Sequence, residues 1–220
     1  MRNAICRMWE FAGYTPSCTV RSCIVAMSKI LAFAGSTRTQ SWNGKLIRVA
    51  VDSLHRHGIE ARLIDLREFP MPLYDGDLEA GQGVPEPARA LKRLMVAHDG
   101  FLIACPEYNS SITAVLKNAI DWVSRPQKED STSAFRGKVV SLLAASPGNL
   151  GGIRGLFTVR QILSVLGCIV LPTQFGLARA HEAFDDNGRL VEPTHQKAVD
   201  AVVSELGNVA SRLHAEDSRQ

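Results

Sequence analysis

Short apolar runs alternate with segments of helical periodicity along the chain from Lys29 onward. Continuous apolar runs predict five strands, at residues 29–35, 59–66, 100–105, 137–146 and 168–172. Apolar side chains at helical spacing predict five helices, at residues 43–58, 86–100, 110–125, 153–167 and 193–216. Strands as uniformly apolar as these are expected to be buried on both faces, which requires a parallel sheet covered by helices. The pattern therefore predicts an α/β fold with a doubly wound, five-stranded parallel sheet and helices on both faces.

The two ends of the chain and one internal segment fall outside this alternation. Residues 1–28 are rich in Cys, Arg and Ser and show no period. They are either a weak transit peptide or, in the interpretation we favour, an extension outside the fold that reflects a start codon assigned ahead of Met27. Residues 67–85 form a long connection crowded with Pro, Gly and acidic residues, and connections of this length are usually functional or mobile. We expect an extension at 1–28, one domain at 29–214 and a polar tail at 215–220.

Composition and charge fit one mildly basic globular domain. The 220 residues include 45% hydrophobic and 21% charged side chains, enough for one well-buried core. The formal charge of +3 comes from scattered Lys and Arg residues, which favours a small anionic ligand over nucleic acid. Residues 1–28 contain no uninterrupted apolar stretch of the kind found in a secretory signal or a membrane span.

The five cysteines give no sign of zinc or thioredoxin-like chemistry. Their number is odd, they lie far apart and they include no C-x-x-C pair, so we expect no metal site and a reduced, cytoplasmic setting. Cys105, at a strand end, is either a reactive thiol or a small buried hydrophobic residue, and we favour the second interpretation.

Function is expected in the loops that follow the strands, because ligands of doubly wound sheets bind outside the carboxyl ends of the strands. The first loop, 35–43, combines the hydroxyls of Ser36, Thr37, Thr39 and Ser41 and the Arg38 guanidinium with the start of a helix. This set can bind a phosphate without a metal. The loop matches neither the Walker motif nor G-x-G-x-x-G. The alternative interpretation is a Ser/Thr-rich turn that caps the helix.

Two further loops at the same edge carry other chemistry. Pro106 to Asn109 follow the third strand; the N–H groups after the proline can meet the edge of a planar heterocycle, and Tyr108 offers an aromatic surface. Read alone, Glu107 can instead be a general acid and Tyr108 a packing residue. Ser146 to Gly152, after the fourth strand, contain three glycines that permit close approach of the backbone to a flat ligand.

Together the three loops resemble the NADPH-dependent FMN reductase family, which includes bacterial chromate, quinone and azo-dye reductases. The resemblance is carried by "AGSTR" with Ser41 and Asn43, by "PEYNSSITAVLKNAIDWVSRP" and by "SPGNLGGIRGLFTVRQIL", and it spans about residues 29–171. It implies a flavodoxin-like fold that binds FMN. By this resemblance Ser36, Thr37, Arg38, Ser41, Trp42 and Asn43 would lie around the FMN phosphate and ribityl chain, Pro106, Glu107, Tyr108 and Asn109 would hold the isoalloxazine ring, and Ser146, Gly148 and Gly151 would flank its other side.

The resemblance also implies a reaction. NADPH would pass a hydride to N5 of the flavin and leave, and a quinone, azo compound, metal oxyanion or free flavin would then take the electrons in a ping-pong cycle. Because the flavin carries the chemistry, no residue is expected to act as a catalytic acid or base. The alternatives are an FMN-binding electron carrier or redox sensor, disfavoured by the basic charge, and a phosphate-ester hydrolase, for which the sequence offers no clear nucleophile or base.

Members of this family usually form dimers or tetramers. We therefore expect a homodimer or homotetramer that acts on a small-molecule electron acceptor, with no nucleic-acid or membrane partner. The helix with Ile120, Trp122 and Val123 either forms part of the contact between subunits or packs on the sheet through Trp122.

Overall fold

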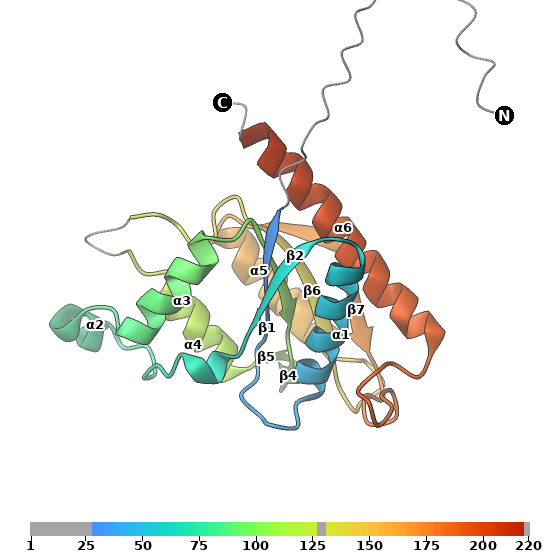
Figure 1. The fold of residues 1–220 in the computed structure, drawn as a ribbon. Coiled ribbons are helices and arrows are strands. Elements are labelled where there is room, and N and C mark those ends of the chain that lie inside the picture. Colours follow the sequence, from blue (N-terminus) through green and yellow to red (C-terminus); the bar gives the residue numbers. More distant parts are fainter. Residues whose placement is uncertain (1–27, 127–130, 218–220) are drawn as a thin grey trace, which may run out of the picture.

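A computed structural model describes residues 28–126 and 131–217, and Figure 1 shows how they are arranged. Within these residues, five parallel strands form the main sheet in the order β2-β1-β3-β6-β7. The strands are β1 (Lys29–Ala34), β2 (Glu60–Ile64), β3 (Gly100–Ala104), β6 (Val139–Ala145) and β7 (Ile169–Leu177). The doubly wound sheet predicted from the sequence is thus confirmed. The direction in which strands are added reverses at β1 and β3, where such sheets bind ligands.

Helices cover both faces of the sheet and bury their apolar stripes against it (Figure 1). Leu46, Ala50 and Leu54, one helical turn apart, all lie on the buried side of their helix. One face carries α1 (Trp42–Arg56) and α6 (Pro193–Asp217), and the other carries α3 (Glu86–Val96), α4 (Ala114–Val123) and α5 (Ile153–Val165).

The expectation that every strand is buried on both faces is wrong for the two edge strands. β1, β3 and β6 are buried almost throughout, whereas most of β2 is exposed and β7 is only partly buried. β7 also continues to Leu177 instead of ending at Pro172. Pro172 lies in a register irregularity opposite Ser141, and pairing resumes at Gln174. A bulge at an edge strand accommodates a proline, which cannot donate a ladder hydrogen bond.

The connection at 67–85 contains a short helix that the sequence pattern did not reveal. A 3-10 turn, η1 (Leu66–Glu68), is followed by α2 (Gly76–Gln82), in which no residue is buried. An exposed seven-residue helix with two glycines has no apolar stripe from which to recognise it. The segment is linked to the end of α4, because Arg125 Nε donates to Glu79 at 2.9 Å.

Trp122 belongs to the interior of the fold. It is fully buried, its Nε1 donates to the Pro72 carbonyl at 2.8 Å, and its ring meets that of Tyr74 edge-on at 5.0 Å. Ile120 and Val123 are buried as well. The interpretation of these α4 side chains as a contact between subunits is therefore wrong, because other parts of the same chain already cover them.

The predicted end segments lie mostly outside the described residues, which exclude 1–27 and 218–220. α6 continues to Asp217, past the domain boundary expected at residue 214. None of the described helices combines the length and the apolar character needed to cross a membrane.

Candidate functional site

Four connections meet at the carboxyl edge of the sheet, the lower edge in Figure 1. Residues 35–41 lead from β1 into α1, a small hairpin follows β3, residues 146–152 lead from β6 into α5, and residues 178–192 join β7 to α6. All three segments singled out in the sequence are therefore at one edge. The fourth connection, 178–192, was not recognised from the sequence.

The P-E-Y-N segment folds as a hairpin. β4 (Glu107–Tyr108) pairs with the antiparallel β5 (Ser111–Ile112), and the turn residues Asn109 and Ser110 have φ angles of 51° and 63°. Positive φ at both positions is the type I′ geometry that suits two-residue hairpins. The helix predicted from residue 110 consequently begins only at α4, after the hairpin. Tyr108 is 50% exposed beside the hairpin tip.

Glu107 points away from solvent to the start of α5. Its carboxylate accepts hydrogen bonds from the N–H of Arg154 at 3.0 Å, the N–H of Gly155 at 3.3 Å and Nε of Arg154 at 2.7 Å. Burial raises the pKa of Glu107, but these donors and the Arg154 charge outweigh it and hold the pKa below its ordinary value. An ionised carboxylate with these commitments has no proton to give, so the general-acid interpretation is wrong.

The first loop offers donors and a cation, and two acids, Asp65 and Glu68, lie nearby after the end of β2. Ser41 Oγ caps α1 by accepting from the Gly44 N–H at 3.2 Å, which confirms the capping interpretation for this residue, and the first turn of α1 contains no acid. Arg38 is exposed and forms no ion pair with any described residue. Four loop N–H groups have no acceptor within the described residues; they belong to Ser36, Thr37, Thr39 and Gln40. Such a set suits an anion.

A hollow of about 200 Å³ lies beside this loop, between α1 and the end of β2. It is lined by Ser36, Arg38, Thr39 and Ser41 among others. Ser36, Arg38 and Ser41 of the predicted phosphate residues thus share one concave surface with Asp65 and Glu68, whereas Thr37 does not line it.

Asn43 and Trp42 are engaged with other connections of the edge. Asn43 is 3% exposed; its Nδ2 donates to the Ala145 carbonyl at 2.8 Å and its Oδ1 accepts from the Ala145 N–H at 2.9 Å. The Trp42 ring stacks on Phe184 with centroids 6.0 Å apart, and Lys45 Nζ lies 4.7 Å from the Trp42 ring centroid. Asn43 therefore joins the first loop to the end of β6, and Trp42 joins it to residues 178–192.

The glycines after β6 are required by packing at one position and open at another. A Cβ on Gly151 (φ 60°) would lie 2.6 Å from the carbonyl of Gly176 in β7. Gly151 is buried there, so the expectation that it flanks a ligand is not supported by its surroundings. Gly148 is exposed, and a Cβ at that position would meet only Ser146 Oγ, at 3.6 Å. Ser146 is half-buried and accepts from the Gly148 N–H at 3.2 Å.

Several residues that hold the edge together were missed in the sequence. Thr113 Oγ1 donates to the Gly35 carbonyl at 2.6 Å and also caps α4, so a Thr immediately before the apolar-periodic run was an available signal. The role of Phe184 had no signal, because a single aromatic residue in a polar loop does not reveal what it stacks on.

Cys105 is a buried thiol, which agrees with the interpretation as a small buried hydrophobic residue. It is fully buried at the end of β3, and burial, with a smaller effect of the Glu107 charge, raises its pKa to about 12. Within 28–126 and 131–217, no cluster of three or more His, Cys, Asp or Glu side chains could hold a metal ion.

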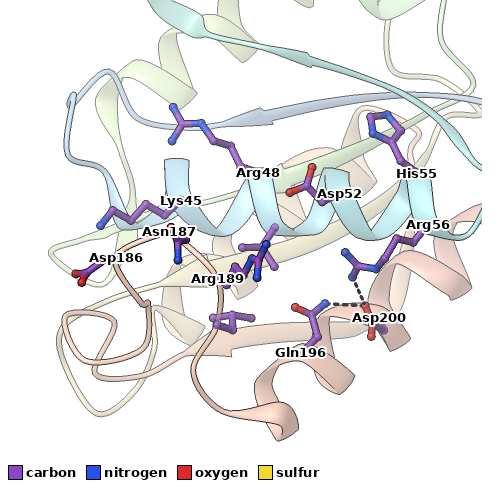
Figure 2. A pocket seen from close by; sticks show the side chains of 13 residues that line it. Lys45, Arg48, Asp52, His55, Arg56, Asp186, Asn187, Arg189, Gln196 and Asp200 are labelled. Atoms are coloured by element: carbon purple, nitrogen blue, oxygen red, sulfur yellow. Dashed lines mark hydrogen bonds and ion pairs between the residues drawn. The ribbon is translucent and has the colours of Figure 1, made fainter.

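A larger depression of about 1110 Å³ lies between α1 and the turn at 186–190, which is part of the connection after β7. Figure 2 shows its charged side chains, with Lys45 and Arg48 extending from α1 in different directions. Arg56 is paired with Asp200 at 3.3 Å, and acids and bases alternate around the rim. The side chains do not converge on a common point, so we assign no ligand here.

Comparison with known proteins assigns the chain to a family. The family model named NADPH-dependent FMN reductase matches residues 28–182, which include the three predicted loops. The chain belongs to this family. Among FMN reductase relatives, an NAD(P)H-dependent FMN reductase of Pseudomonas aeruginosa is 34% identical over 186 residues, or 84% of this chain and 96% of the relative. A quinone reductase of Pseudomonas putida is 34% identical over 173 residues, or 76% and 89%.

Solved structures agree with the family assignment. The flavoenzyme NAD(P)H:(acceptor) oxidoreductase FerB of Paracoccus denitrificans matches with a TM-score of 0.71 at 25% identity, over 84% of this chain and 98% of FerB. The predicted flavodoxin-like fold of an FMN reductase family member is therefore confirmed.

Proposed function

We propose that this FMN reductase family member is an NAD(P)H-dependent FMN and quinone reductase that holds FMN at the carboxyl edge of its sheet. The observation that carries the proposal is the convergence of residues 35–41, the β4–β5 hairpin and residues 146–152 at the β1/β3 reversal point, inside the region matched by the family model. Relatives that cover most of the chain are named for FMN and quinone reduction, which supports the same reaction class.

The residues present fit FMN. The first-loop N–H groups that have no acceptor within 28–126 and 131–217, the loop hydroxyls and the exposed Arg38 would hold the phosphate. The hairpin would hold the ring: Tyr108 is half-exposed, and the Asn109 N–H has no acceptor within the described residues. Leu150, 56% exposed after β6, adds an apolar side chain from the opposite loop.

Bound FMN would supply hydride transfer from NADPH to the acceptor. The residues of this chain bind and orient, because the two groups nearest to acid–base chemistry are unsuited to it: Glu107 is ionised and committed to α5, and Cys105 is a buried thiol. Reductant and acceptor would use the same open edge in turn, which requires the oxidised nucleotide to leave before a quinone, azo compound, metal oxyanion or free flavin binds.

An anaerobic titration tests the proposal. Protein incubated with FMN and freed of excess should stay yellow and bleach with NADPH, and steady-state data at several quinone concentrations should give parallel double-reciprocal lines. Intersecting lines would remove the ping-pong order. Protein that takes up no FMN would remove the proposal itself, and an FMN protein that oxidises no NAD(P)H without a partner reductase would be the electron carrier instead.

We also propose self-association in the cytoplasm. With Ile120, Trp122 and Val123 buried, α5 is the better candidate surface, since its Phe157 and Val165 are 61% and 83% exposed. Sedimentation of the wild-type protein should give a dimer or larger, and Val165→Glu should shift it toward the monomer; a monomeric wild-type protein would contradict this.

A further inference from the structure

α5 begins without a capping side chain of its own. Its N-cap is Gly152, with φ 84° and no side-chain hydrogen bond, and its first turn contains no acid. The first N–H groups of a helix have no acceptor within the helix, so a Ser, Thr, Asp or Asn usually supplies one. In this fold Ser41, Asp75 and Thr113 do so for α1, α2 and α4. α5 needs an acceptor from elsewhere.

Glu107 supplies that acceptor from the neighbouring hairpin. One carboxylate oxygen, Oε2, accepts from the N–H of Arg154 and of Gly155, and the other, Oε1, accepts from the Arg154 side chain. The Glu107 side chain is only 7% exposed. Carboxylates are stabilised at the positive end of a helix, and bonds between charged partners are stronger than neutral ones. The contact therefore joins the hairpin and the helix firmly.

The start of α5 packs closely on the hairpin. A Cβ on Gly155 would lie 3.4 Å from Glu107 Cα, in van der Waals contact. The hairpin itself has only two residues in each strand, which is too few for independent stability. Its orientation must come from outside, and α5 contacts both of its strands.

We propose that Glu107 is a positioning residue: its carboxylate caps α5 in place of a local N-cap and thereby fixes the orientation of the hairpin that holds the flavin ring. This inference rests on the proposed function. It assigns the carboxylate no contact with the ring and no proton transfer, and it predicts a defect specific to ring binding when the carboxylate is neutralised.

Flavins with and without phosphate separate this role from others. Glu107→Gln keeps the side-chain size but turns one accepting oxygen into an NH₂ group that faces donors. If the hairpin is then correctly oriented about a tenth of the time, affinity falls about tenfold. We expect this rise in Kd for FMN and for riboflavin alike, measured by quenching of flavin fluorescence, because both ligands contain the ring.

Two other variants serve as references. Arg38→Gln, in the first loop, should raise the Kd for FMN and leave the Kd for riboflavin unchanged, since riboflavin has no phosphate. Glu86→Gln is the matched control. Glu86, like Glu107, forms ion pairs with arginine, but its partners Arg89 and Arg93 lie with it on the exposed side of α3. This variant should leave both Kd values unchanged.

The coupling with Arg154 gives a second test, which also serves if Glu107→Gln does not fold. Arg154→Leu removes the guanidinium but keeps both backbone donors. It should raise the Kd for both flavins by a smaller factor, about threefold. Arg154→Leu added to Glu107→Gln should cost less than the product of the single effects, because both disturb one contact.

Two results would overturn the inference: unchanged riboflavin binding in Glu107→Gln, whether or not FMN binding changes, or fully multiplicative effects in the double variant. They differ from failure of the proposed function, in which the wild-type protein itself would bind neither flavin and both ideas would fall together.

Discussion

The amide of Asn43 is expected to be one of the largest single contributors to stability at the carboxyl edge. It is buried and forms two hydrogen bonds with the backbone of Ala145, 2.8 Å to the carbonyl and 2.9 Å to the N–H. Asn43→Ala leaves both backbone groups without a partner. Each unsatisfied buried group costs about 1–3 kcal/mol, so the variant should lose about 2–6 kcal/mol of unfolding free energy. For a loss near the middle of this range, Tm should fall by roughly 8–16 °C in a domain of this size.

Asn43→Asp refines the test. The carboxylate keeps an acceptor for the Ala145 N–H but places its second oxygen against the Ala145 carbonyl, where Nδ2 now donates. At neutral pH this variant should be at least as unstable as Asn43→Ala. Its folded state should raise the pKa of the new carboxyl group, because only the protonated form can donate to the carbonyl. The deficit should therefore shrink as pH falls through that raised pKa.

The assay is urea and thermal unfolding followed by circular dichroism, without flavin. Asn208→Ala is the matched control: the same atoms are removed from an exposed position on α6, and the change should stay within about 0.5 kcal/mol. If Asn43→Ala unfolds within about 1 kcal/mol of the wild type, the pair with Ala145 contributes no more than an ordinary exchange with water. The reasoning from buried unsatisfied groups would then be refuted for this site.

Three further predictions concern glycine, cysteine and glutamate side chains. Gly151→Ala should lower the free energy of unfolding by more than the roughly 1–2 kcal/mol that a left-handed alanine costs, because its Cβ meets the Gly176 backbone. Gly188 is the control: its φ is 77°, and a Cβ there would meet no described atom within 4 Å. Equal losses in the two variants would contradict the clash. Burial raises the pKa of both Cys105 and Cys168 to about 12, so neither thiol should react with a disulfide reagent at pH 8 until denaturant is added, and peptide mapping that finds either one labelled in the native protein would oppose this. Because the pKa of Glu107 is lowered in the folded protein, its ion pair stabilises the fold at pH above the unfolded pKa of about 4.3, and this stabilisation is lost as pH falls through the folded pKa. The difference in unfolding free energy between the wild type and Glu107→Gln should therefore close in acid. A difference that does not depend on pH would argue against an ionised Glu107.

The sequence predicted the sheet and the edge at which the three loops meet, but not the local structure of these loops. Apolar runs identify strands such as β3 because a strand covered on both faces needs apolar side chains on both. The hairpin escaped because its turn is Asn109-Ser110, without the glycine that usually marks a type I′ turn. The β7 extension escaped because Pro172 normally ends a strand, and only the bulge opposite Ser141 lets pairing resume.

The residues that carry the family resemblance have two different roles, contact with a ligand and connection between loops, which a short motif cannot separate. Arg38 and Tyr108 are exposed at the edge and can meet a ligand, whereas Asn43, Glu107 and Gly151 are committed to Ala145, to α5 and to Gly176. Both kinds need a fixed residue type at a fixed position, so both appear in the motif. Stability tells them apart: changing a buried connector should weaken flavin binding and also destabilise the free protein, whereas changing an exposed contact should weaken binding alone. Loops joined in this way are largely ordered before any ligand arrives, so little binding free energy is spent on ordering them.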